Sequence, residues 1–173
     1  SPISRRKSLR RASVLILVGA FVLAASVTYL SYTRDLDAAR ARLTAGSQVI
    51  ETPHGLIEYA VKGSGPTVLV IHGAGGGYDQ GLLLSRAFGG DNFQWIAPSR
   101  FGYLRTPLPP NASTAAQADA LADLLDTLGV QRVSIVAHSG GVPPALQFAL
   151  RHPERTSALV LMAGAPYTPL TAA

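Results

Sequence analysis

The chain has 173 residues, which is enough for one folded domain with a sizeable core. Its formal net charge is +5, but five of the fifteen Lys and Arg residues come before residue 12, and the other ten are balanced by ten Asp and Glu residues. The part that follows is therefore neutral and has no basic stripe, which argues against a nucleic acid partner. The absence of cysteine excludes disulfides, a thiol nucleophile and a zinc–thiolate site.

Residues 1–33 predict a basic N-terminus followed by a transmembrane helix. Residues 12–33 carry no charge and are mainly Leu, Val, Ile, Ala and Phe, and about 20 apolar residues span the hydrocarbon core of a bilayer. The positive charges before this run, and the Arg34-Asp35 boundary after it, predict that the N-terminus lies in the cytoplasm. We therefore expect a single-pass membrane protein that is anchored through residues 12–33, with the rest of the chain on the non-cytoplasmic side.

Two alternatives remain open for this segment. Ala24-Ala25-Ser26 offers small residues to a signal peptidase, and cleavage there would leave a secreted or periplasmic protein. Ser4-Arg5-Arg6-Lys7-Ser8-Leu9 is similar to a twin-arginine signal, with Ser8 where phenylalanine is typical. The apolar run is longer than the usual core of a signal peptide, which favours a retained signal anchor.

Residues 34–46 alternate charge and alanine and predict a short helix or a linker before a domain that covers residues 47–173. This domain begins with an antiparallel hairpin over residues 48–51 and 56–61 at the edge of a sheet. Strands and helices then alternate, which predicts a doubly wound, mostly parallel sheet with helices on both faces. The expected elements are strand 67–71, helix 79–89, strand 93–97, helix 114–128, strand 132–137, helix 141–151 and strand 157–162.

The most informative segment is Val133–Gly141, in which an apolar, β-branched run ends in Ala-His-Ser-Gly-Gly and a helical pattern follows at once. This order is typical of a nucleophile elbow, where a serine sits at the apex of a tight turn between a strand and a helix. Such a turn needs small residues two places before and two places after Ser139, and Ala137 and Gly141 meet that need. The alternative for Ser139 is a turn serine that caps the following helix through its hydroxyl.

A second motif precedes the elbow by about 65 residues. The apolar run Thr67–Ile71 predicts a strand that is buried on both faces, and it leads into His72-Gly73-Ala74-Gly75-Gly76-Gly77. A glycine run of this kind lets backbone N–H groups approach a ligand that side chains would otherwise block. The two motifs together supply a serine and a place to hold an oxyanion.

With these two motifs, residues 47–166 resemble the α/β-hydrolase family, and the stretches 96–103 and 147–155 agree with that resemblance. The resemblance implies a sheet of α/β-hydrolase type that is incomplete at the C-terminus of this chain. It also implies that Ser139 is the nucleophile and that the backbone N–H groups of Gly140 and Ala74 form the oxyanion hole, with Gly75 as the alternative to Ala74. Gly73 and Gly75 would shape this loop, and His72 would brace it by hydrogen bonds. Branches with an aspartate nucleophile are disfavoured, because serine occupies the position.

The resemblance implies a serine hydrolase that cleaves a small-molecule carboxylic ester through an acyl-enzyme, without a metal or other cofactor, and the apolar run 12–33 is expected to anchor it in a membrane. Amides share this chemistry, so a proline-type aminopeptidase is a close competitor. Arg100 and Tyr103 are expected at the entrance of the site. The alternative for Arg100 is that it bridges loop carbonyls. The sequence gives no indication of an oligomeric state.

The catalytic base and acid are the point at which the chain departs from the family pattern, which places both after the serine. Glu154 and His152 are the only candidates there, and they lie about 20 Å down the following helix by its rise. His54 is expected in a solvated turn, His138 is expected to diverge from Ser139 and pack on a neighbouring strand, and His152 is expected to cap helix carbonyls. We therefore expect the 173-residue form alone to be inactive and poorly soluble, and a non-catalytic binding module remains the alternative function.

Overall fold

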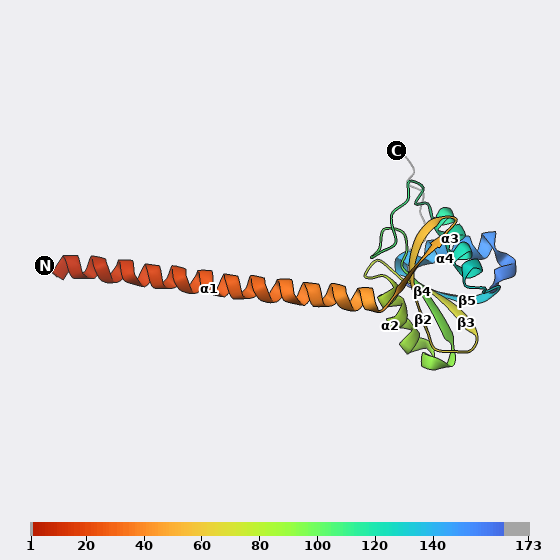
Figure 1. Cartoon of the computed structure of the whole chain (residues 1–173), viewed down its shortest axis with the longest axis horizontal. Coiled ribbons are helices and arrows are strands. Elements are labelled where there is room, and N and C mark those ends of the chain that lie inside the picture. The colour runs from red at the N-terminus through yellow and green to blue at the C-terminus, as the bar shows by residue number, and fades with distance from the viewer. Residues whose placement is uncertain (1, 165–173) are drawn as a thin grey trace. The chain divides into compact units, whose positions relative to one another are not determined.

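The computed structural model describes residues 2–164, with side chains from residue 13 onward. The chain divides into two compact units, with the boundary between Thr44 and Ala45. The first unit is a single helix and the second is an α/β domain (Figure 1).

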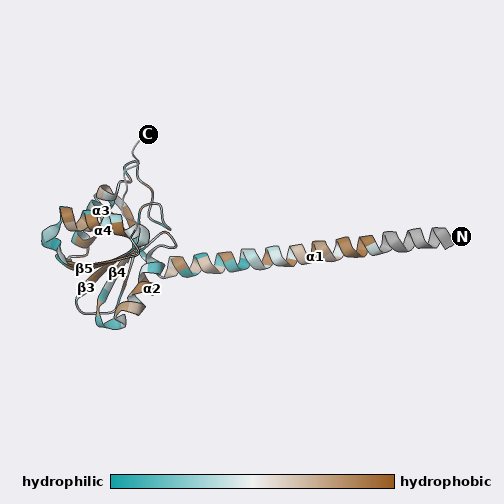
Figure 2. Cartoon of the chain, turned by 180° about the vertical axis from the view of Figure 1, so that it is seen from behind, coloured by the Kyte–Doolittle hydropathy of each residue, from teal (hydrophilic) through white to brown (hydrophobic). Residues whose placement is uncertain are grey.

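Helix α1 runs without interruption from Pro2 to Ala45. Its segment Ser13–Ala45 is long and apolar enough to cross a membrane, with a mean hydropathy of 2.3 over the most apolar 18 residues. Figure 2 shows the hydrophobic residues of this helix toward its N-terminal side and the hydrophilic ones toward its C-terminal side. The segment 34–45, for which the sequence left a helix or a linker open, is helical.

The second unit contains one sheet of six strands in the order β1-β2-β4-β3-β5-β6. The β1–β2 and β2–β4 pairs are antiparallel, and β4, β3, β5 and β6 are parallel to one another. The predicted edge hairpin and the predicted mostly parallel sheet are both confirmed. The strands are β1 Gln48–Thr52, β2 Gly55–Lys62, β3 Thr67–Ile71, β4 Gln94–Pro98, β5 Val133–His138 and β6 Thr156–Met162.

Three helices cover the two faces of this sheet, as the alternating pattern predicts. Helix α2 (Tyr78–Phe88) packs on one face, where Gly81 lies against Val70 and Ala97. Helices α3 (Thr114–Thr127) and α4 (Val142–Arg151) cover the other face and enclose the main hydrophobic core (Figure 1). The core side chains of α3 include Leu121, Leu124 and Leu125, which are fully buried.

The crevice between β3 and β5 is the topological switch point of the sheet. The chain leaves β3 toward β4 on one side and leaves β5 toward β6 on the other, so the loops that follow these two strands diverge. In open α/β sheets, ligands bind at such a point, beyond the carboxyl ends of the strands. Both motifs found in the sequence lie there, because one follows β3 and the other follows β5.

The backbone after β5 lies directly against the end of β3. A Cβ atom at Gly141 would lie 2.4 Å from the Ile71 carbonyl oxygen and 2.6 Å from that of His72. The requirement for a small residue here therefore comes from the close approach of the backbone at the end of β3.

We expect Gly141→Ala in the full-length protein to lower the free energy of unfolding by about 2 kcal/mol or more, because two backbone carbonyls would have to move. Gly75→Ala is the matched control, since its Cβ would meet only the side-chain amide of Gln80, at 2.9 Å, and no backbone atom. Urea unfolding followed by circular dichroism measures both. Equal stability of the two variants would contradict the close packing of the turn.

Candidate functional site

The turn that carries Ser139 has the geometry of a nucleophile elbow. Ser139 follows the last residue of β5 and opens a 3-10 turn, Ser139–Gly141, after which α4 begins at Val142. Its φ angle is +49°, a left-handed conformation that is uncommon for residues other than glycine and is found at functional turns. The Ser139 hydroxyl makes no hydrogen bond to any described residue, so the alternative role as a helix cap is not observed.

The glycine loop after β3 lies beside this turn. A Cβ atom at Gly73 would lie 3.1 Å from Ser139 Cβ, and a Cβ atom at Gly140 would lie 3.8 Å from the Ala74 nitrogen. The structure thus brings together Ser139, Gly140, Gly73 and Ala74. An oxyanion formed by attack of Ser139 on a carbonyl would need N–H donors in this space.

Side chains from α2 bind some of the loop N–H groups and leave others free. Gly73 N–H donates to Gln80 Oε1 at 2.7 Å, and Gly77 N–H donates to Asp79 Oδ1 at 2.8 Å. The Ala74 N–H, in contrast, has no hydrogen-bond partner within the described part of the chain. The Gly75 N–H, the other candidate donor, has no partner there either, but Ala74 is the candidate that lies next to Gly140.

His72 is fully buried and joins two loops through both ring nitrogens. Arg100 N–H donates to His72 Nε2 at 2.9 Å, so the neutral ring carries its proton on Nδ1 and donates it to the Gly73 carbonyl at 2.6 Å. Burial lowers the pKa of His72 from 6.5 to about 4. A neutral ring with both nitrogens in use braces the glycine loop and cannot serve as the base.

Arg100 lies across the glycine loop and the serine turn. It binds loop carbonyls, which is the alternative expected from the sequence to a place at the entrance of the site. Its guanidinium donates to the Gly140 carbonyl at 2.8 Å and to the Gly73 carbonyl at 3.2 Å. The same group lies 4.9 Å from the centre of the Tyr103 ring, which in turn contacts His72 edge-on.

The other three histidines do not act on Ser139 in the structure. His54 lies in an exposed turn, as expected, and its Nδ1 also pairs with Asp123. His152 is the C-cap of α4, as expected, because its backbone N–H donates to the Phe148 carbonyl at 2.8 Å, and its Nε2 pairs with Asp119 at 3.0 Å. His138 packs against the neighbouring loop, where a Cβ atom at Gly73 would lie 2.8 Å from its Nδ1.

A buried carboxylate beside this edge of the sheet was missed by the sequence analysis. Glu58 of β2 is only 1% exposed and accepts hydrogen bonds from the side chains of Arg105 (2.7 Å), Ser47 (2.7 Å) and Ser99 (2.8 Å). Burial alone would raise the pKa of Glu58, but these hydrogen bonds outweigh it and hold the pKa below its usual range.

The Glu58 network also holds the start of α2 in place. Ser99 Oγ, which donates to Glu58, accepts a hydrogen bond from the Tyr78 backbone N–H at 3.1 Å. Because α2 carries Gln80 and Asp79, Glu58 supports the glycine loop indirectly. In the sequence Glu58 looks like a solvent-facing residue of an alternating edge strand, so no pattern marks it.

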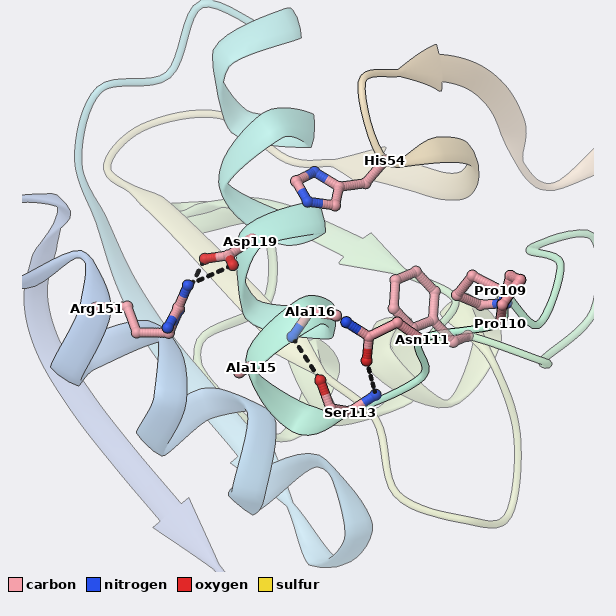
Figure 3. A pocket seen from close by; sticks show the side chains of 10 residues that line it. His54, Pro109, Pro110, Asn111, Ser113, Ala115, Ala116, Asp119 and Arg151 are labelled. Carbon is pink, nitrogen blue, oxygen red and sulfur yellow. Dashed lines mark hydrogen bonds and ion pairs between the residues drawn. The ribbon is translucent and has the colours of Figure 1, made fainter.

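A separate pocket of about 460 Å³ lies beside α3 and contains no residue of the glycine loop or the serine turn (Figure 3). Its charges cancel, since Asp119 forms two hydrogen bonds with Arg151, which together hold the pKa of Asp119 below its usual value. No three His, Asp or Glu side chains among the described residues are arranged to hold a metal ion. The pocket is lined by His54, Phe101, Pro109, Pro110, Asn111, Ser113, Ala115, Ala116, Asp119 and Arg151.

The low pKa of His72 predicts a pH dependence of stability. The unfolded chain takes up the proton near pH 6.5 and the folded protein only near pH 4, so the free energy of unfolding should fall as the pH falls through this window. The difference between these two pKa values corresponds to a loss of about 3 kcal/mol in the free energy of unfolding. We expect this loss in urea unfolding of the full-length protein and expect His72→Gln, which does not titrate, to lack it. Glu58 is present in both proteins and loses its contribution to stability only at lower pH. Identical slopes of the free energy of unfolding against pH, between pH 6.5 and 4, would therefore contradict the role of His72.

Comparison with known proteins agrees with this geometry. The sequence model of the alpha/beta hydrolase fold family matches residues 66–173. The chain is 38% identical over 104 residues to a 2-hydroxymuconate semialdehyde hydrolase of Pseudomonas putida, covering 58% of this chain and 37% of that enzyme. It is 36% identical over 113 residues to an uncharacterized protein of Mycobacterium tuberculosis, covering 64% of this chain and 32% of that protein. The chain spans 32–41% of the length of the curated relatives it matches.

Solved structures show the same fold. An alpha/beta hydrolase fold protein from Nakamurella multipartita superimposes with a TM-score of 0.66 at 34% identity, over 73% of this chain and 45% of that one. A bacterial membrane phospholipase A superimposes with a TM-score of 0.67 at 29% identity, over 94% of this chain and 55% of that one. The glycine loop after β3, the serine turn after β5 and these matches lead to one conclusion: the chain belongs to the alpha/beta hydrolase fold family.

Proposed function

We propose that this chain is part of a serine hydrolase that cleaves carboxylic esters. In this mechanism Ser139 Oγ attacks the ester carbonyl carbon, and the carbonyl electron pair moves onto oxygen, where the N–H groups of Ala74 and Gly140 bind it. The alcohol then leaves with a proton, and water hydrolyses the acyl-enzyme. The observation that carries the proposal is the left-handed Ser139 beside an unpaired Ala74 N–H.

In this proposal, none of the described histidines is the base that takes the proton from Ser139. His72 uses both ring nitrogens, while His54 and His152 each pair with an aspartate. We propose that the base and its supporting acid come from the part of the relatives' length that this chain does not cover. The family order, in which both follow the serine, supports this assignment.

We further propose that α1 anchors the enzyme in a membrane. Five positive charges precede the apolar run 12–33, and Tyr29 and Tyr32 lie near its other end, where aromatic residues favour the membrane interface. The orientation rule then places the hydrolase domain on the non-cytoplasmic side.

The likeness to the membrane phospholipase A extends over 94% of this chain, which supports a membrane lipid ester as one substrate.

The serine chemistry is tested by labelling the full-length membrane protein with a fluorophosphonate probe. We expect labelling of the wild type, loss of labelling in Ser139→Ala, and a parallel loss of hydrolysis of a short-chain aryl ester and of phosphatidylcholine vesicles. Ser134→Ala, on the same strand, is the matched control and should keep both activities. A folded, unlabelled wild-type protein would favour the non-catalytic binding module, and hydrolysis of the aryl ester but not of the vesicles would exclude the lipid substrate.

The anchor is tested by placing a charge in the middle of the apolar run. Val22→Arg should reduce membrane insertion, because a charge at the bilayer centre costs roughly 3 kcal/mol. Ser31→Arg, near the end of the run, is the control, since its side chain can reach the interface. Fractionation after alkaline carbonate extraction measures both variants. A wild-type protein that stays in the cytoplasm with its N-terminus intact would refute the anchor.

A further inference from the structure

The carbonyl group of Gly73 receives two side-chain donors. His72 Nδ1 donates to this oxygen at 2.6 Å and an Arg100 guanidinium nitrogen donates to it at 3.2 Å. The two donors are themselves joined, because the Arg100 backbone N–H donates to His72 Nε2 at 2.9 Å. One peptide oxygen of the glycine loop is thus held by two residues that come from two different strand ends.

Fixing this oxygen also fixes the Ala74 N–H. Gly73 C=O and Ala74 N–H belong to the same peptide unit, which is planar and trans, so the two groups point in opposite directions. With the oxygen bound on one side, the N–H is turned to the other side, where it has no partner among the described residues and where Gly140 lies nearby. A donor on a peptide oxygen also polarises that peptide and strengthens its N–H as a donor.

Arg100 also connects to the serine turn, through the carbonyl of the Gly140–Gly141 peptide, which follows directly on the peptide that carries the Gly140 N–H. Its other terminal nitrogen donates to Gly140 O at 2.8 Å, so a single guanidinium spans the two loops that carry Ala74 and Gly140. The planar fork of arginine has two separate N–H edges in a fixed relation, and neither lysine nor glutamine has this geometry.

We propose that Arg100 is a positioning residue of the oxyanion hole, which holds the Gly73–Ala74 peptide and the serine turn so that Ala74 N–H and Gly140 N–H face the same oxygen. This inference rests on the proposed serine hydrolase function. Arg100 acts on the reaction through these two peptides and makes no contact with the substrate. It does not change the base or the nucleophile.

The test compares Arg100→Gln with Arg155→Gln in the full-length protein. Arg155 is a matched control, because its guanidinium also donates to backbone carbonyls, those of Val130 (2.7 Å) and Gln131 (3.3 Å) in a loop and that of Ala122 (3.3 Å) in α3. It is similarly shielded, with a side chain 12% exposed, and it lies away from both loops of the site. The loss of carbonyl contacts is expected to lower the Tm of both variants.

Only Arg100→Gln should lower kcat for an aryl ester, by roughly 10- to 100-fold and with little change in KM, since a mispositioned donor weakens binding of the transition-state oxyanion. Affinity for an alkyl boronic acid, which forms a tetrahedral adduct on the serine, should fall by a similar factor. Arg100→Lys, which keeps a charge and one donor at a time, should recover part of kcat.

Three results would overturn the inference. An unchanged kcat in Arg100→Gln together with a lower Tm would make Arg100 a purely structural residue, like Arg155. A raised KM with unchanged kcat would make it a substrate contact. Equal falls of kcat in both variants would mean a general loss of rigidity. Failure of the proposed function is a separate result, since Ser139→Ala would then keep full esterase activity.

Discussion

The backbone of the serine turn lies against the end of β3, and the rest of the site depends on that contact. The β3–β5 register pairs Ile71 with Ala137, so the residues that follow both strands reach the same edge together. Gly141 then fits against the Ile71 and His72 carbonyls, and Gly73 fits against His138 and Ser139, at distances that no side chain would permit. Because no Cβ atoms separate the two loops, their backbone N–H groups converge within a few ångströms of the serine. Backbone packing thus brings together Ala74 and Gly140, the two residues proposed to bind an oxyanion.

Buried polar side chains of opposite character hold this arrangement. His72 stays neutral because burial lowers its pKa to about 4, and a neutral ring can donate from one nitrogen and accept at the other. Glu58 stays ionised because its four hydrogen bonds outweigh the cost of burial, and a carboxylate can accept all four. The first residue fixes the glycine loop from β3 and the second fixes the start of α2. The glycine loop is therefore supported from two directions, which is what a preorganised site requires.

The two units of the chain differ in how far their apolar side chains are buried. The described side chains of α1 before Thr33 are exposed and mainly apolar, which agrees with the proposed membrane anchor. The α/β domain, in contrast, buries a large apolar core between the sheet and its own helices. The last strand of the described sheet, β6, leaves Val160 and Leu161 exposed, at 45% and 40%.

The sequence determined every strand of the sheet to within about two residues, because β-branched runs, helical periodicity and glycine stops are local signals. It also brought Ser139 and the glycine loop to one edge, since the carboxyl ends of parallel strands meet there. The partners of single side chains were decided only by the tertiary structure. Arg100 on two loop carbonyls, His54 on Asp123 and His152 on Asp119 join residues that lie 27 to 69 positions apart. The register between strands and the packing of helices set such contacts, and neither quantity is encoded in the local pattern of one segment.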